Sequence, residues 1–227
     1  MTPRLILFDV DGTLVDSQAH IVAAMSTAFA ACDMTPPARA EILSIVGLSL
    51  PQAMARLAPQ AGPDDLARLV EAYKDSFSSS RRAAGLEGAP PLFPGMMDLL
   101  DTLAAMPEAV LGVATGKSRR GLDHLFEAHA LAPLFLTVQV ADDHPSKPHP
   151  SMVRTAMAET GIDAAATVMI GDTSFDMEMA RSAGVAALGV GWGYHPGAAL
   201  TQAGALSVAD DAGALRLALE TAGKAPA

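Results

Sequence analysis

Short runs of apolar residues alternate with segments of helical spacing along much of the chain, and this alternation predicts the fold class. The first run covers residues 4–9 and is continuous, which is typical of a strand that is covered on both faces. Helical patterns, such as residues 118–129 and 150–160, separate later runs of the same kind. These later runs cover residues 109–114, 134–140, 167–170 and 186–190. Strands that alternate with helices predict an α/β protein with a parallel, doubly wound sheet.

The interval between the first two predicted strands is far longer than a crossover requires. From residue 17 to residue 89 the pattern is helical, and it is broken only where Pro and Gly cluster. Because a crossover helix needs roughly a dozen residues, this interval predicts an inserted, all-helical domain. We therefore expect two domains. Residues 1–16 and 90–227 would form a discontinuous core, and residues 17–89 an inserted helical domain that moves on hinges near the two junctions.

Composition narrows the class of protein. The chain has 227 residues, half of them hydrophobic, and 25 Asp and Glu against 15 Lys and Arg, which gives a formal charge of −10. This much apolar content argues against disorder. The acidic balance argues against a nucleic-acid or membrane surface as a partner, because both reward clustered Lys and Arg. The single cysteine, Cys32, fits a reducing compartment, and Asp9 interrupts the first apolar run too early for a signal peptide. We expect a cytoplasmic protein whose oligomeric state the sequence leaves open.

Polar motifs follow several of the predicted strands. Because the carboxyl ends of parallel strands converge on one crevice, we expect these motifs to meet. Clustered carboxylates repel one another unless cations neutralise them. A lysine supplies one positive charge, and Mg²⁺, which prefers oxygen ligands, would supply the rest. The motifs are Asp9 and Asp11, Thr115 and Gly116, Lys147, and Asp172 and Asp176.

Each motif alone also has an ordinary structural explanation. Asp9 and Asp11 suit a turn before a glycine, and the acids of residues 172–176 suit the first turn of a helix. Thr115 could cap the helix that follows, and Lys147 could be an exposed loop lysine. Their joint order at the strand ends favours a single chemical site over four separate coincidences.

This combination resembles the haloacid dehalogenase-like hydrolase superfamily. DVDGTLVDS at residues 9–17 carries most of the resemblance, and GDTSFD at residues 171–176 and the segment at residues 92–104 support it. Residues 189–205 suggest the phosphoglycolate phosphatase-like branch. The resemblance implies a Rossmann-like core with a helical cap. It also implies a Mg²⁺-dependent phosphatase that hydrolyses a small phosphorylated metabolite, with phosphoglycolate as the first candidate.

The resemblance also implies a role for each matched residue. Asp9 would attack phosphorus and form an aspartyl-phosphate. Asp11 would protonate the leaving alkoxide and then deprotonate the attacking water. Thr115 and the backbone N–H of Gly116 would bind phosphoryl oxygens, and Lys147 would offset the charge that Asp9 shares with the phosphoryl group.

A metal-binding set follows from the same resemblance. Asp9, the backbone carbonyl of Asp11 and the carboxylate of Asp172 would ligate Mg²⁺. Asp176, one helical turn after Asp172, would hold either the metal or a water bound to it.

One position departs from the family pattern, and two readings of function stay open beside the phosphatase. Many relatives carry Asn where this chain has Gly116, so contacts to the leaving group can differ; we read the next residue, Lys117, as an exposed helix start. A phosphosugar mutase would use the same two aspartates, and a non-catalytic binding protein could keep the scaffold. Residues 47–50 form either a loop over the site or a plain turn between helices.

Overall fold

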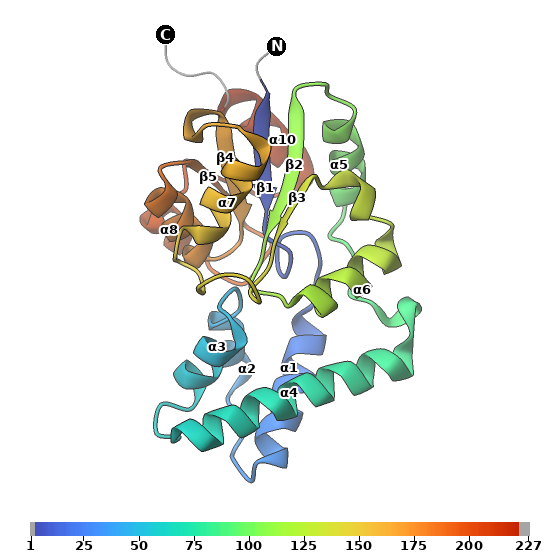
Figure 1. Ribbon diagram of the computed structural model, residues 1–227, viewed down its shortest axis with the longest axis vertical. Helices are drawn as coiled ribbons and strands as arrows, with labels where there is room; N and C mark the ends of the chain where they lie inside the picture. Colours follow the sequence, from blue (N-terminus) through green and yellow to red (C-terminus); the bar gives the residue numbers. More distant parts are fainter. Residues whose placement is uncertain (1–2, 223–227) are drawn as a thin grey trace.

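The core of the protein is a six-stranded sheet in which every strand runs parallel to its neighbours. The computed structural model describes residues 3–222, and the strand order is β3-β2-β1-β4-β5-β6 (Figure 1). The chain adds β2 and β3 on one side of β1 and β4 to β6 on the other side, so a crevice opens beyond the carboxyl end of β1. The strands are β1 (Arg4–Phe8), β2 (Ala109–Ala114), β3 (Thr137–Gln139), β4 (Thr167–Gly171), β5 (Ala186–Val190) and β6 (Ser207–Ala209).

Helices cover both faces of the sheet, which explains why the central strands are continuous apolar runs. Alternate residues of β1 serve the two faces: Ile6 and Phe8 pack on one side, Leu5 and Leu7 on the other. The first face is covered by α5 (Met96–Ala104), α6 (Arg119–His129) and α10 (Ala212–Ala222). The second is covered by α7 (Ser151–Thr160), α8 (Ser174–Ala183) and α9 (Gly197–Ala203). The expected Rossmann-like, doubly wound α/β fold is confirmed.

A separate group of helices lies beyond the carboxyl ends of the strands (Figure 1). We call it the cap. The cap has its own apolar core, in which Met25, Ile42, Met54 and Leu69 are fully or almost fully buried. The division of the chain at residues 17 and 89 stays a prediction. The cap helices are α1 (Gln18–Ala31), α2 (Arg39–Ser44), α3 (Leu50–Leu57) and α4 (Pro63–Ala84), followed by the 3₁₀ turn η1 (Leu86–Gly88).

The two chain segments that join the cap to the core lie side by side. The backbone N–H of Asp16 donates to the carbonyl of Pro91 at 2.9 Å, and the N–H of Phe93 donates to the carbonyl of Leu14 at 2.9 Å. Val15 and Leu92 form an antiparallel bridge between them. Any movement of the cap therefore has to bend a short two-stranded connection.

One predicted strand was wrong in extent, and one strand was not predicted. The run at residues 134–140 yields a strand of only three residues, because residues 132–134 form the 3₁₀ turn η2 (Ala132–Leu134) around Pro133, which lacks a backbone donor. Leu136, just before the strand, is 74% exposed. The edge strand β6 was not predicted, because three residues with an exposed Ser207 leave no apolar run to detect.

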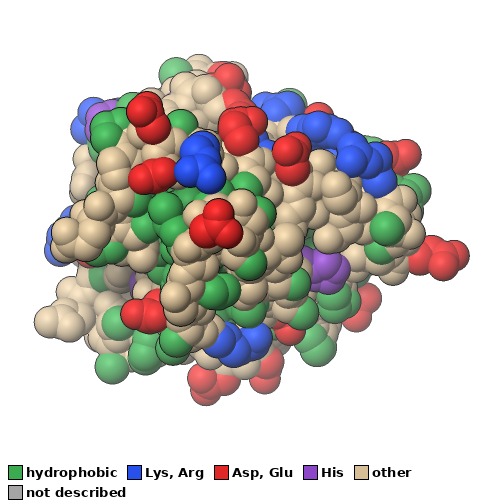
Figure 2. Space-filling view, turned by 90° about the horizontal axis from the view of Figure 1, so that it is seen from below, with side chains coloured by type: hydrophobic (Ala, Val, Ile, Leu, Met, Phe, Trp, Pro, Cys, Tyr) green, Lys and Arg blue, Asp and Glu red, His purple; other side chains and the backbone are tan. Residues whose placement is uncertain are grey.

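The outer surface of the cap is chemically mixed. Figure 2 shows this face with Lys and Arg interspersed among Asp, Glu and hydrophobic side chains. None of the helices in the described part of the chain is long and apolar enough to cross a bilayer.

Candidate active site

The carboxyl ends of three neighbouring strands bring the sequence motifs together. Asp9 follows β1, Thr115 follows β2 and Asp172 follows β4. Lys147 comes from the loop between β3 and α7, and Asp176 from the first turn of α8. All five are buried, and Lys147 is fully enclosed. The expectation that these distant motifs meet at one edge of the sheet agrees with the geometry.

Lys147 lies between two carboxylates. Its Nζ donates to Oδ1 of Asp9 at 2.7 Å and to Oδ1 of Asp176 at 2.6 Å. The other oxygen of Asp176 accepts from the backbone N–H of Thr173 at 3.1 Å and from its hydroxyl at 2.7 Å, which caps α8. Asp176 therefore caps the first turn of α8 and anchors Lys147 at the same time, so the structural reading of this residue is correct and its metal-binding role stays a prediction.

Asp172 is held from two sides. The hydroxyl of Thr13 donates to Oδ1 at 2.9 Å, and the backbone N–H of Tyr194 donates to Oδ2 at 2.9 Å. The carboxylate fits only because two glycines surround it: a Cβ at Gly12 or Gly193 would lie 2.2 or 2.1 Å from its atoms. Gly12 also has a φ of +92°, which disfavours other residues there.

Burial dominates the electrostatics of this cluster. Burial raises the pKa of Asp9 to about 6, because it outweighs the attraction of Lys147, and repulsion from Asp176 adds to the rise. The pKa of Asp172 is raised well above its usual range, first by burial and then by Asp9 and Asp176. Burial lowers the pKa of Lys147, but the carboxylates of Asp176 and Asp9 more than reverse this and hold it above its ordinary value.

The residues present fit a divalent cation. One oxygen each from Asp9, Asp172 and Asp176 lie within 4.8 Å of one another. In the described part of the chain, Oδ2 of Asp9 is buried without a hydrogen-bond partner. Three buried carboxylates face one lysine, so the cluster retains an excess of negative charge that a hard cation with oxygen ligands would neutralise.

Asp11 is held by Lys117, which is more enclosed than the sequence predicted. Lys117 Nζ donates to both oxygens of Asp11 at 2.7 Å, and the side chains are only 9% and 11% exposed. The prediction that Lys117 begins an exposed helix was wrong, because Ser118 caps α6 and the helix starts after it. The same ammonium lies 5.5 Å from the centre of the Phe77 ring in the cap.

The packing of the cap against the core explains why residue 116 is a glycine. The loop at residues 45–49, between α2 and α3, reaches down to the core; we call it the cap loop. A Cβ at Gly116 would lie 2.5 Å from the carbonyl oxygen of Gly47 in this loop, so a side chain such as Asn has no room. The N–H of Ser49 donates to the hydroxyl of Ser146 at 2.8 Å, beside Lys147. Of the two readings left open for residues 47–50, the loop over the site is the one observed.

Two further residues connect the core to the cap, and the sequence motifs did not reveal them. His195 Nδ1 accepts from the N–H of Ser174 at 3.1 Å, so its other nitrogen carries the proton and donates to the carbonyl of Ser44 in the cap at 3.2 Å. The hydroxyl of Tyr194 lies 2.9 Å from that of Ser17. Their only sequence signal was a cluster of aromatic and polar residues directly after β5.

A cavity of about 490 Å³ lies between the core and the cap. Asp9, Asp11 and Thr115 contribute to its core wall. The cap wall comes from helices α1, α3 and α4 and the cap loop, and includes Ile21, Met25, Val46, Leu48, Val70, Tyr73 and Phe77. The cavity therefore connects the proposed nucleophile and acid to a space large enough for the rest of a substrate.

Comparisons with known proteins agree with this geometry. A family model described as haloacid dehalogenase-like hydrolase matches residues 6–190. A probable phosphatase of Dickeya dadantii, IndB, is 40% identical over 195 residues, which cover 84% of this chain and 82% of that protein. A phosphoglycolate phosphatase of Rhodospirillum rubrum is 32% identical and covers 92% of this chain and 88% of its own. A solved hydrolase structure from Pseudomonas syringae superposes with a TM-score of 0.84 at 26% identity, covering 97% of this chain and 99% of that one.

The matched region runs from the middle of β1 to the end of β5 and includes the whole cap and every candidate site residue. The prediction of an enzyme of the hydrolase class, related to phosphatases, is confirmed. On this evidence, the chain belongs to the haloacid dehalogenase-like hydrolase family.

Proposed function

We propose that this chain is a Mg²⁺-dependent phosphomonoesterase that acts on a small phosphorylated metabolite through an aspartyl-phosphate on Asp9. One observation carries the proposal. Asp9 lines the cavity with Asp11, and among the described residues only one of its two carboxylate oxygens has a protein partner, Lys147. The carboxylate is thus fixed in direction while it keeps free lone pairs for attack.

The reaction would proceed in two displacements at phosphorus. In the first, an oxygen of Asp9 forms a bond to phosphorus while the bond from phosphorus to the alcohol oxygen breaks, and Asp11 gives its proton to that oxygen. In the second, Asp11 takes a proton from water as the water oxygen bonds to phosphorus and the bond to Asp9 breaks. Lys117 holds the Asp11 carboxylate toward the cavity with two hydrogen bonds.

The rest of the site would balance charge. Asp9, Asp172 and the backbone carbonyl of Asp11 would hold Mg²⁺, with Asp176 holding the ion or a water bound to it. The ion supplies neutralisation of the phosphoryl charge. Thr115 and the N–H of Gly116 would bind phosphoryl oxygens, as both residues line the cavity. Lys147 would offset the negative charge that Asp9 shares with the phosphoryl group, and its full burial strengthens this interaction.

Phosphate release from 4-nitrophenyl phosphate tests this proposal. We expect hydrolysis that requires Mg²⁺ and stops with a chelator. Asp9→Asn should lower kcat by about 10⁴-fold or more, as the loss of a nucleophile does elsewhere. Asp143→Asn is the matched control, because Asp143 is exposed and lies outside the cavity. Full activity of Asp9→Asn would refute the assignment of the nucleophile.

The same assay separates the alternatives. Interconversion of a hexose 1-phosphate without phosphate release would indicate a mutase, and no turnover on a broad panel of phosphate esters would indicate a binding protein. A cytoplasmic location is part of the proposal. It is supported by the single cysteine, Cys32, which is buried and unpaired.

A further inference from the structure

The cavity is large for the substrate that the relatives' names suggest. At about 490 Å³ it lies within the range of roughly 300–1,000 Å³ that encloses drug-sized ligands. A phosphoryl group next to Asp9 and Thr115 would fill only the core end. The two-carbon acid that remains of phosphoglycolate would leave most of the cap end empty.

The buried lining of the cavity is apolar wherever it is not catalytic. Among the described residues, the buried polar side chains that line it are Asp9, Asp11 and Thr115, together with Lys117, which is bound to Asp11. The buried remainder of the side-chain lining is aliphatic, from α1, α3 and the cap loop: Ile21, Met25, Ile45, Val46, Leu48 and Ala53. A carboxylate placed against these side chains would lose its hydration without gaining a partner.

The cation nearest the catalytic residues is already engaged. Lys117 is enclosed, and both of its hydrogen bonds go to Asp11, the proposed acid. Diverting Lys117 to a substrate carboxylate would release Asp11 from its position. The enclosed cation of the cavity is thus already bound to the proposed acid. In the described part of the chain, no other enclosed cation of the lining is available to pair with a second anionic group of the substrate.

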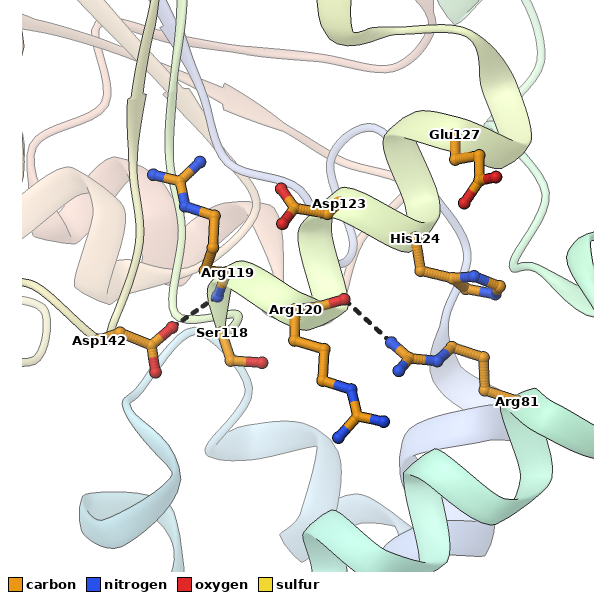
Figure 3. A pocket seen from close by; sticks show the side chains of 8 residues that line it. All are labelled: Arg81, Ser118, Arg119, Arg120, Asp123, His124, Glu127 and Asp142. Atoms are coloured by element: carbon orange, nitrogen blue, oxygen red, sulfur yellow. Dashed lines mark hydrogen bonds between the residues drawn. The ribbon is translucent and has the colours of Figure 1, made fainter.

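The other cations lie at the mouth, where water reaches them. Lys74 is 58% exposed and pairs with Glu71. Figure 3 shows Arg81, from the cap, donating to the backbone carbonyl of Arg120 on α6 at 2.9 Å in a hollow outside the cavity. Arg81 and Arg120 line both spaces, so they mark the entrance and not the interior.

Two aromatic rings form part of the cap wall. Tyr73 and Phe77 lie one turn apart on α4 and stack with centroids 5.8 Å apart and an interplanar angle of 23°. Both line the cavity, and the charge of Asp11 reaches Tyr73, whose pKa is raised first by burial and then by that carboxylate. This pair gives an apolar, ring-sized surface close to the point where the alcohol would leave.

We propose that the alcohol part of the substrate is bulky, mostly apolar and ring-bearing, and that it packs against Tyr73, Phe77 and the cap loop. This inference rests on the proposed phosphomonoesterase function and adds the substrate class to it. It distinguishes this chain from an enzyme built for phosphoglycolate.

A matched pair of substrates tests it. 2-Phenylethyl phosphate and ethyl phosphate have leaving alcohols of similar acidity, so a difference in kcat/KM measures the cavity and not the chemistry. We expect 2-phenylethyl phosphate to be favoured by about ten- to a hundredfold, as burial of a phenyl group predicts, with phosphoglycolate no better than ethyl phosphate. Equal values, or a preference for phosphoglycolate, would overturn the proposal.

A variant that fills the cavity sharpens the test. Val70→Trp adds volume to the cap wall and should bring the ratio of the two kcat/KM values close to one. Ala67→Trp is the control: Ala67 is exposed on the same helix and lies outside the cavity, so its ratio should match the wild type. If a folded Val70→Trp protein kept the wild-type ratio of the two kcat/KM values, this would contradict packing of the alcohol against the cap wall.

Binding separates this inference from the proposed function. The probes are 2-phenylethylphosphonate and ethylphosphonate, titrated calorimetrically into the full chain with Mg²⁺. We expect the phenylethyl compound to bind at least about tenfold more tightly, and equal affinities would overturn the inference. Absence of phosphatase activity on every ester would refute the proposed function, while this affinity ratio would still decide the nature of the cavity.

Discussion

The two walls of the cavity differ in how their residues are held. On the core wall, Asp9 is fixed by a buried lysine at 2.7 Å, and that lysine is fixed in turn by Asp176 at 2.6 Å. The cap wall contains apolar side chains, and its loop reaches the core mainly through backbone groups, such as the N–H of Ser49 and the carbonyl of Gly47.

This difference separates two tasks. A network of buried charges keeps one geometry, because each displaced member would leave an uncompensated charge. It therefore suits a reaction that is the same for every phosphate ester. Apolar packing can be exchanged residue by residue at modest cost, so the cap wall is where one relative can differ from another in its choice of alcohol.

The largest expected effect comes from breaking the core wall. Lys147→Met removes the cation that pairs with both Asp9 and Asp176, so two buried carboxylates lose their positively charged partner. We expect the free energy of unfolding to fall by about 3–5 kcal/mol in urea titrations without metal. Lys74→Met, which breaks an exposed pair on the cap, should change it by less than about 1 kcal/mol. Similar losses in both variants would contradict the difference between the walls.

The fold and the core wall were largely predictable from sequence. Continuous apolar runs identified β1, β2, β4 and β5, because covered parallel strands need apolar residues on both faces. The proposed catalytic acids were detectable because chain order and strand ends place them together in any sheet of this kind. At the sheet edges, β3 was predicted too long and β6 was missed, since short and partly exposed strands carry a weak apolar pattern.

A smaller effect concerns pH and metal. The pKa of Asp9 is raised to about 6 by burial, so the metal-free folded state binds this proton more tightly than the unfolded chain does. Its contribution to stability therefore falls as pH rises from about 4 through 6, by up to about 3 kcal/mol. Thermal unfolding of wild type and Asp9→Asn without metal checks this: the Asn variant should gain stability relative to wild type between pH 4 and pH 8. Mg²⁺ should reduce this gain, and a pH-independent difference would count against the raised pKa.

The smallest expected effect concerns the contact between the walls. Gly116→Asn adds a side chain whose Cβ would collide with the carbonyl oxygen of Gly47. The cap loop must then withdraw, and we expect kcat/KM to fall by about a hundredfold while the unfolding midpoint stays near that of wild type. Gly62→Asn is the control, because a Cβ at Gly62 meets nothing within 4 Å. Unchanged kcat/KM in Gly116→Asn would show that the closed loop is not needed.

Contacts between core and cap could not be predicted from the sequence, because they depend on how the cap packs against the core. From the sequence, Gly116 suggested an altered contact to the leaving group, whereas in the structure it makes room for the backbone of Gly47. Lys117 looked like an exposed helix start, whereas it is enclosed by Asp11 and the cap residue Phe77. Gly47 lies about seventy positions before Gly116, and Phe77 lies about forty positions before Lys117. Hydrophobic spacing predicts local structure and not contacts over such separations.

The central claim is that the core wall transfers the phosphoryl group to Asp9 itself. Asp11→Asn tests it most directly with 4-nitrophenyl phosphate, whose leaving group needs no acid, while the water that completes the cycle still needs a base. After acid quenching with Mg²⁺ present, mass spectrometry of peptides should show one phosphoryl group on Asp9. Turnover with no phosphoryl group on Asp9, or with one on another residue, would contradict the account.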